Sequence, residues 1–137
     1  MTTATRSLDD TTVARHQIAN LLAAYLEAAD RKDVEAAVAV LGQAEVSFPA
    51  GTSHDPETAR ALFTKLWGNP TKHRHDLSNL LVLPGDTPGT WIARAHYTRY
   101  VLTPEPVLNT LGEYDVVVDE ATWTLRRLIV TRTWVQA

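Results

Sequence analysis

The spacing of apolar residues changes at Pro70, and this change limits the fold more than any other feature of the chain. Before Pro70, apolar residues recur at helical spacing in three segments, 11–29, 34–41 and 56–67. After it, four segments are rich in β-branched and aromatic residues, 73–83, 90–103, 107–118 and 122–135. The first pattern is typical of amphipathic helices, and the second is typical of strands. Helices followed by strands predict an α+β fold in place of alternating βαβ units.

Local signals mark the ends of these elements. Asp33 and Asp55-Pro56 are helix-start signals, and Gly42 follows the predicted end of the second helix. Residues 46–48 alternate as a short strand that Pro49, Ala50 and Gly51 close. Short turns join the four long strands, so we expect these strands to pair antiparallel as a meander.

The predicted strands are long for so small a sheet, roughly 10 to 14 residues, and long strands twist and coil. We therefore expect three N-terminal helices packed on the open side of a strongly curved antiparallel sheet. Such an arrangement leaves a conical pocket between the helices and the sheet. Pockets of this kind are the usual place for chemistry in a small domain.

Composition limits the partners and the location of the chain. A length of 137 residues suits one domain, which we place at residues 11–137, with the polar residues 1–10 as a flexible tail. A net charge of −3, without a basic cluster longer than a pair, predicts no nucleic-acid partner. No apolar run approaches the roughly 18 residues of a membrane span. The absence of cysteine removes thiol chemistry and favours a reducing, cytoplasmic location.

Three polar residues are candidates for catalysis. Tyr25 belongs to the apolar stripe of the first helix, Asp30 follows at the end of that helix, and His75 lies on the first long strand. A histidine that donates to a carboxylate from one ring nitrogen becomes a better base at the other. From periodicity alone, Tyr25 can equally be a core tyrosine and Asp30 a linker carboxylate.

A larger ordered pattern accompanies these residues: Ile18, Tyr25, Asp30 and Asp33, then Val46 and Phe48, Arg74-His75 and Asn79, Gly85-Asp86, Ala93, Ala95 and Tyr97, Gly112 and Tyr114, and Trp123 before Arg126-Arg127. It resembles the SnoaL-like branch of the NTF2-like superfamily, over nearly the whole chain. That branch includes scytalone dehydratase, bile-acid dehydratase, hexachlorocyclohexane dehydrochlorinase and, more distantly, ketosteroid isomerase and polyketide cyclases. The resemblance implies a cone-shaped α+β barrel around a buried pocket.

The resemblance also implies roles for individual residues. Asp30 and His75 match the Asp-His dyad of the dehydratase-type members, and Tyr25 matches a tyrosine that assists it. Other family residues are replaced here. The catalytic carboxylate of the isomerase falls near Phe48 and its second acid near Tyr114, and the residue set of limonene epoxide hydrolase has no clear match.

Further residues are candidates for the pocket wall. We expect Asn79, Phe48, Trp91, Tyr97 and Tyr114 to contact substrate, although a tryptophan such as Trp91 is also explained by the core. His73 is expected at a solvated strand end, where with His75 it makes no three-ligand metal set. Arg126 and Arg132 share a strand face; salt bridges are the commoner role for such residues, and the alternative is that one of them reaches an anionic group of the substrate.

Together these features favour an acid–base enzyme without a metal or cofactor, since the chain has no glycine-rich nucleotide loop. The predicted activity is that of a lyase, either a dehydratase or a polyketide-type cyclase, acting on a small hydrophobic or polyketide-like molecule. The alternatives are a non-catalytic module that binds a ligand or a protein, and an enzyme of the same fold that uses water as an epoxide hydrolase does. Apolar residues on both faces of some strands, with the resemblance, favour a homodimer or homotrimer.

Overall fold

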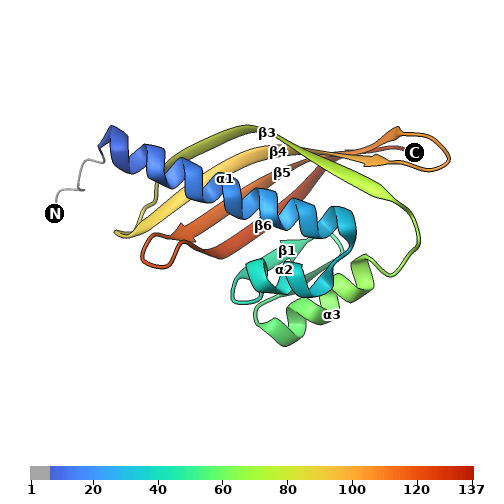
Figure 1. The fold of residues 1–137 in the computed structure, drawn as a ribbon, viewed down its shortest axis with the longest axis horizontal. Helices are drawn as coiled ribbons and strands as arrows, with labels where there is room; N and C mark the ends of the chain where they lie inside the picture. The colour runs from blue at the N-terminus through green and yellow to red at the C-terminus, as the bar shows by residue number, and fades with distance from the viewer. Residues whose placement is uncertain (1–6) are drawn as a thin grey trace.

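The computed structural model describes residues 7–137, which form three helices and one six-stranded sheet of order β2-β1-β6-β5-β4-β3. Helix α1 (Leu8–Arg31) crosses one face of the sheet, and α2 (Val34–Leu41) and α3 (Pro56–Leu66) gather near its C-terminal end (Figure 1). The α+β class predicted from the sequence is confirmed. The sheet is open, with β2 and β3 at its two edges.

Capping residues explain where the helices begin. Asp33 caps α2 through the Ala36 amide, and Asp55 caps α3 through Thr58, as predicted. Helix α1 begins at Leu8, earlier than the expected residue 11, because Ser7 and Asp10 form a capping box that satisfies the first amides. Residues 8–10, expected to be part of the tail, are therefore helical, and residues 1–6 lie outside the described part of the chain.

The four long strands follow the sequence prediction closely. They are β3 (His73–Pro84), β4 (Thr90–Val101), β5 (Val107–Asp119) and β6 (Thr124–Val135), and consecutive strands pair antiparallel. The expectation of a wholly antiparallel sheet is wrong at one edge. There β1 (Glu45–Phe48) runs parallel to β6, so that buried Val46 lies beside buried Leu128. A short strand missed in the sequence, β2 (Gly51–Ser53), pairs with β1.

Helix α1 packs on the sheet along most of its length. Its buried residues from Ala14 to Ala29, including Ile18 and Leu22, form one cluster with sheet residues such as Val116 and Val118. Because α1 runs opposite to β3, its N-terminal part lies near Leu80 and its C-terminal end lies at the start of β3. Asp30 at the helix end therefore faces the first residues of that strand. Among the described residues, no helix is long and apolar enough to span a membrane.

Gly112 on β5 allows an aromatic side chain to lie flat across the sheet. It pairs with Tyr97 on β4, and a Cβ atom at Gly112 would collide with the Tyr97 ring. Tyr97 in turn stacks on Tyr114, with ring centroids 4.6 Å apart. The missing side chain thus fixes where two tyrosines lie.

We expect Gly112→Ala to lower the free energy of unfolding by about 1 to 3 kcal/mol, because the added methyl displaces the Tyr97 ring from a packed position. Urea denaturation measures the difference. Gly51→Ala is the matched control, since its methyl would meet only the end of the Leu62 side chain, at 3.1 Å. Equal stability of the two variants would contradict this account of Gly112.

Candidate active site

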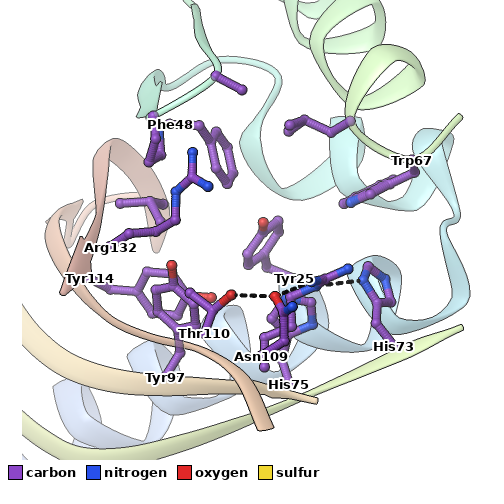
Figure 2. Close-up of a pocket in the computed structure, with 15 residues that line it drawn as sticks. Tyr25, Phe48, Trp67, His73, His75, Tyr97, Asn109, Thr110, Tyr114 and Arg132 are labelled. Carbon is purple, nitrogen blue, oxygen red and sulfur yellow. Dashed lines mark hydrogen bonds between the residues drawn. The ribbon is translucent and has the colours of Figure 1, made fainter. Parts of the chain in front are cut away.

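A pocket of about 250 Å³ opens between the C-terminal half of α1, the β1–β2 turn, the end of α3 and strands β3 to β6. Aromatic side chains form much of its wall: Tyr25, Phe48, Trp67, Tyr97 and Tyr114. The polar residues gather on the strands: His73, His75, Arg99, Asn109, Thr110 and Arg132 (Figure 2). The pocket therefore has an apolar side and a strongly polar side.

Asp30 and His75 are in direct contact at the polar side. Asp30 lies in the last turn of α1, and its Oδ1 accepts hydrogen bonds from both the backbone N–H and the ring Nδ1 of His75, each at 2.8 Å. An ionised carboxylate can only accept, so Nδ1 of His75 carries the proton. The lone pair of the imidazole is then on Nε2, the nitrogen that Asp30 leaves free.

Burial decides the charge of His75. Its burial lowers the pKa below the usual value, although the hydrogen bond and charge of Asp30 act in the opposite direction. The ring is therefore neutral at pH 7, with Asp30 holding one tautomer. A neutral, oriented imidazole beside a pocket can take up a proton.

His73 is buried, and the prediction that it is a solvated strand-end residue is wrong. Its Nε2–H donates to the carbonyl oxygen of Ala29 at 2.5 Å, and its Nδ1 accepts from Nε of Arg99 at 3.1 Å. Burial, with the nearby positive charges, lowers the pKa of His73 to about 4. It therefore acts as a neutral link between the end of α1 and Arg99. One feature of the sequence does predict that His73 lies near the site: it is two residues before His75, so both rings lie on one face of β3.

Tyrosine hydroxyls supply hydrogen-bond donors to the pocket. Tyr25 is buried against Phe48, Phe63 and Tyr114, and its hydroxyl points into the pocket (Figure 2). Burial raises the pKa of Tyr25 well above the usual value, and it raises that of Tyr114 likewise. These phenols stay protonated at neutral pH, so each offers an O–H donor for a ligand oxygen.

Arginine and amide groups complete the polar side, and sequence reasoning missed most of them. Arg99 lies opposite His75 in the β3–β4 register, and its Nη1 donates to Oδ1 of Asn109 at 2.6 Å. Thr110 donates to the same oxygen at 2.7 Å. Arg132, one of two arginines considered for an anionic group, does line the pocket. Alternation along a strand does not identify these residues as pocket-lining, because several other polar residues on the same strands occupy equivalent alternate positions.

Three of the five residues expected to contact substrate line the pocket, namely Phe48, Tyr97 and Tyr114, and two do not. Asn79 is exposed because a bulge between Ser78 and Leu81 breaks the alternation, leaving Asn79 with a φ of 53° beside His96. Trp91 is fully buried at the opposite end of β4, where its Nε1 donates to Glu120 at 3.2 Å. Both predictions are therefore wrong.

Asp30, His73 and His75 also bring three possible metal-ligand atoms within 4.8 Å of one another. The two histidines alone make no three-ligand set, as expected from the sequence, but the fold brings Asp30 to them as a third possible ligand. Both nitrogens of His73 already make hydrogen bonds, and Oδ1 of Asp30 holds His75. A metal ion would have to replace these bonds. The donors therefore fit a hydrogen-bonded network better than a metal centre.

A family model described as a SnoaL-like domain matches residues 10–133. No curated protein matches the chain significantly.

Several solved structures share the fold. A hexachlorocyclohexane dehydrochlorinase from Novosphingobium barchaimii is 17% identical, with a TM-score of 0.80 and coverage of 95% of this chain and 93% of that one. A candidate scytalone dehydratase from Novosphingobium aromaticivorans is also 17% identical, with a TM-score of 0.76 and coverage of 95% and 91%. ActVI-ORFA from Streptomyces coelicolor is 15% identical, with a TM-score of 0.74 and coverage of 87% and 96%.

We expect the free energy of unfolding to fall as the pH drops from about 6.5 to about 4, because His73 takes up a proton in the unfolded chain and not in the folded one over that range. Urea denaturation at a series of pH values measures this slope. In His73→Gln, which keeps a donor towards Ala29, the slope should be smaller. Identical slopes for the two proteins would contradict the buried, neutral state of His73.

Proposed function

We propose that this chain, which belongs to the SnoaL-like domain family, is a cofactor-independent acid–base enzyme, a lyase of the dehydratase type or a cyclase, acting on a small hydrophobic molecule. One observation carries the proposal. Asp30 binds Nδ1 of His75 beside a pocket, which leaves Nε2 of a neutral imidazole to act as a base.

The proposed elimination begins with proton removal. Nε2 of His75 takes a proton from a carbon next to a carbonyl group, and Asp30 stabilises the imidazolium that forms. Tyr25 donates a hydrogen bond to the carbonyl oxygen, where negative charge develops. The bond to a hydroxyl on the adjacent carbon then breaks, the imidazolium returns its proton to that oxygen, and water leaves. The product contains a conjugated double bond, and the enzyme regains its starting state.

The pocket supports a small substrate. Its volume of about 250 Å³ lies just below the range of roughly 300 to 1,000 Å³ that suits drug-sized ligands, so a compound of one or two rings is the best match. Phe48, Trp67 and the stacked pair of Tyr97 and Tyr114 offer flat apolar surfaces to such rings.

The names of two similar structures favour elimination over other acid–base reactions. A dehydratase removes the elements of water, and a dehydrochlorinase removes those of hydrogen chloride. Both reactions are eliminations, in which a proton and a leaving group are lost from the substrate. At 17% identity these proteins share the fold with this chain, so their reactions guide the choice of test compounds only.

We expect His75→Ala and Asp30→Asn each to lower kcat/KM by about 10² to 10⁴-fold, the usual contribution of a positioned acid or base. The assay follows the absorbance of the conjugated product from a panel of one- and two-ring β-hydroxy ketones. In the unaltered protein kcat/KM should rise with pH and level off above a pKa below 6.5, because burial lowers the pKa of His75.

His96→Ala is the matched control, since this histidine is exposed and lies outside the pocket. Unchanged turnover in both His75→Ala and Asp30→Asn would rule out the mechanism. Binding of the compounds without any turnover would identify a ligand-binding module. Entry of ¹⁸O from labelled water into the product would identify a hydrolase.

We also propose that the protein is a homo-oligomer, a dimer or trimer. Exposed apolar residues gather where the β4–β5 hairpin meets the end of β6, a part of the sheet that extends beyond the helices (Figure 1): Val107, Leu108, Leu111, Trp134 and Val135. Trp134 lies opposite Leu111 in the strand register, so the two form one continuous patch.

We expect Trp134→Glu to reduce the mass measured by light scattering after size-exclusion chromatography to that of a monomer, because a charge at the centre of an apolar contact opposes association. Arg126→Glu, on the same strand but paired with Asp119, should leave the mass unchanged. A monomeric unaltered protein would contradict the proposal.

A further inference from the structure

Two arginines line the pocket without a carboxylate partner. Arg99 comes from β4 and Arg132 from β6, on either side of β5. Other arginines of the described residues, such as Arg60 and Arg126, make ion pairs with Glu or Asp. The residues lining the pocket include no Asp or Glu. Its wall therefore carries two arginines that make no ion pair with any other of the described residues.

The partners of Arg99 are neutral and hold its guanidinium in place. Nε donates to His73 and Nη1 donates to Asn109, which Thr110 also contacts. A guanidinium has five N–H groups, so the remaining three are available to a ligand. The network thus orients a charged fork without neutralising it.

Arg132 lines the same pocket two strands away from Tyr97, across a position that has no side chain. Tyr97, Gly112 and Arg132 form one row across β4, β5 and β6, and Gly112 has no side chain to separate the other two. The charge of Arg132 acts on both Tyr97 and Arg99. Among residues 7–137, the side chain of Arg132 makes no hydrogen bond or ion pair, although its backbone belongs to the β5–β6 ladder. Its guanidinium is free to bind an anion together with Arg99.

We propose that the pocket recognises a small aromatic or alicyclic carboxylic acid, whose carboxylate binds between Arg99 and Arg132. Arg99 is half-buried, and a partly buried cation is stabilised by an anionic partner; Arg132 is exposed at the pocket mouth and adds a second positive charge. The planar guanidinium matches the two oxygens of a carboxylate. Among the described residues Asp30 makes its ion-pair contact with His75 and with neither arginine.

This inference rests on the proposed function in one respect. Because His75 lies opposite Arg99 in the strand register, a bound carboxylate places the carbons of the same molecule near the proposed base. The inference therefore names the substrate class of that site. The ring of the acid would then lie against the aromatic wall formed by Phe48, Tyr97 and Tyr114.

Calorimetric titration with benzoate and 2-naphthoate, against benzamide and 2-naphthamide, tests the proposal without requiring turnover. We expect the acids to bind about ten- to hundredfold more tightly than their amides, since hydrogen bonds to charged groups are the stronger ones. Arg132→Gln should remove most of this preference. Arg126→Gln, on the same strand but outside the pocket, should keep it.

Arg99 is held by neighbours within the fold, so Arg99→Lys is the second variant; it keeps the charge, loses the fork and should weaken binding of the acids more than that of the amides. Equal binding of acids and amides would overturn the proposal. So would displacement of benzoate by equimolar inorganic phosphate, which would identify a general anion site. If the acids bind tightly to both the unaltered protein and His75→Ala but no compound is turned over, the proposed catalysis fails while the carboxylate site stands.

Discussion

The attachment of the C-terminal end of α1 to the first strand of the meander is the interaction on which the rest of the site depends. Asp30 accepts from the backbone and the ring of His75, and His73 donates to the carbonyl oxygen of Ala29. Two consecutive helix residues thus meet two alternate strand residues on one face. A helix end carries unsatisfied carbonyl groups, and a strand at the edge of a sheet carries unpaired amides. Asp30 satisfies the amide of His75, and His73 adds a second donor to the Ala29 carbonyl oxygen, which also accepts from the Lys32 amide. The position of the proposed base is therefore fixed by backbone contacts as well as by its own ring.

Burial gives the groups around this contact distinct protonation states. It lowers the pKa of both histidines and raises that of Tyr25, so a neutral base and a protonated donor stand in one pocket at neutral pH. Burial also opposes the charge of Arg99, yet a guanidinium keeps its charge. The arginines are thus the groups that bring lasting positive charge to the pocket wall. Desolvation therefore keeps His75 neutral and, on the neighbouring strand, makes the half-buried Arg99 attractive to an anion.

Sequence patterns predicted the parts of this structure that depend on local rules. The capping signals Asp33 and Asp55-Pro56 fixed two helix starts, and β-rich segments fixed four strands within a few residues. Resemblance to a family joined Asp30 to His75 across the chain. The errors arose at positions where a strand irregularity or a contact between distant segments changes what the local residue pattern predicts. A bulge after Ser78 turned Asn79 outward, and the parallel pairing of β1 with β6 depends on contacts between segments far apart in the sequence. Trp91 was predicted to line the pocket because it is a large aromatic residue, but residue type does not tell which end of a strand lies at the pocket.

The proposed base and the residues proposed to select the substrate depend on different contacts of the fold. Asp30 and His75 depend on how α1 meets β3, whereas Arg99, Gly112 and Arg132 depend on the register of β4, β5 and β6. Substitutions on those three strands can change the shape and charge of the wall while the contact at the helix end persists. His73 touches both parts, through Ala29 and through Arg99, and His75 itself lies beside the Tyr97 ring. Because the ring of His73 is neutral, it holds the helix end and Arg99 in position without adding a charge between them, which allows the same Asp–His contact to be combined with a wall suited to a different molecule.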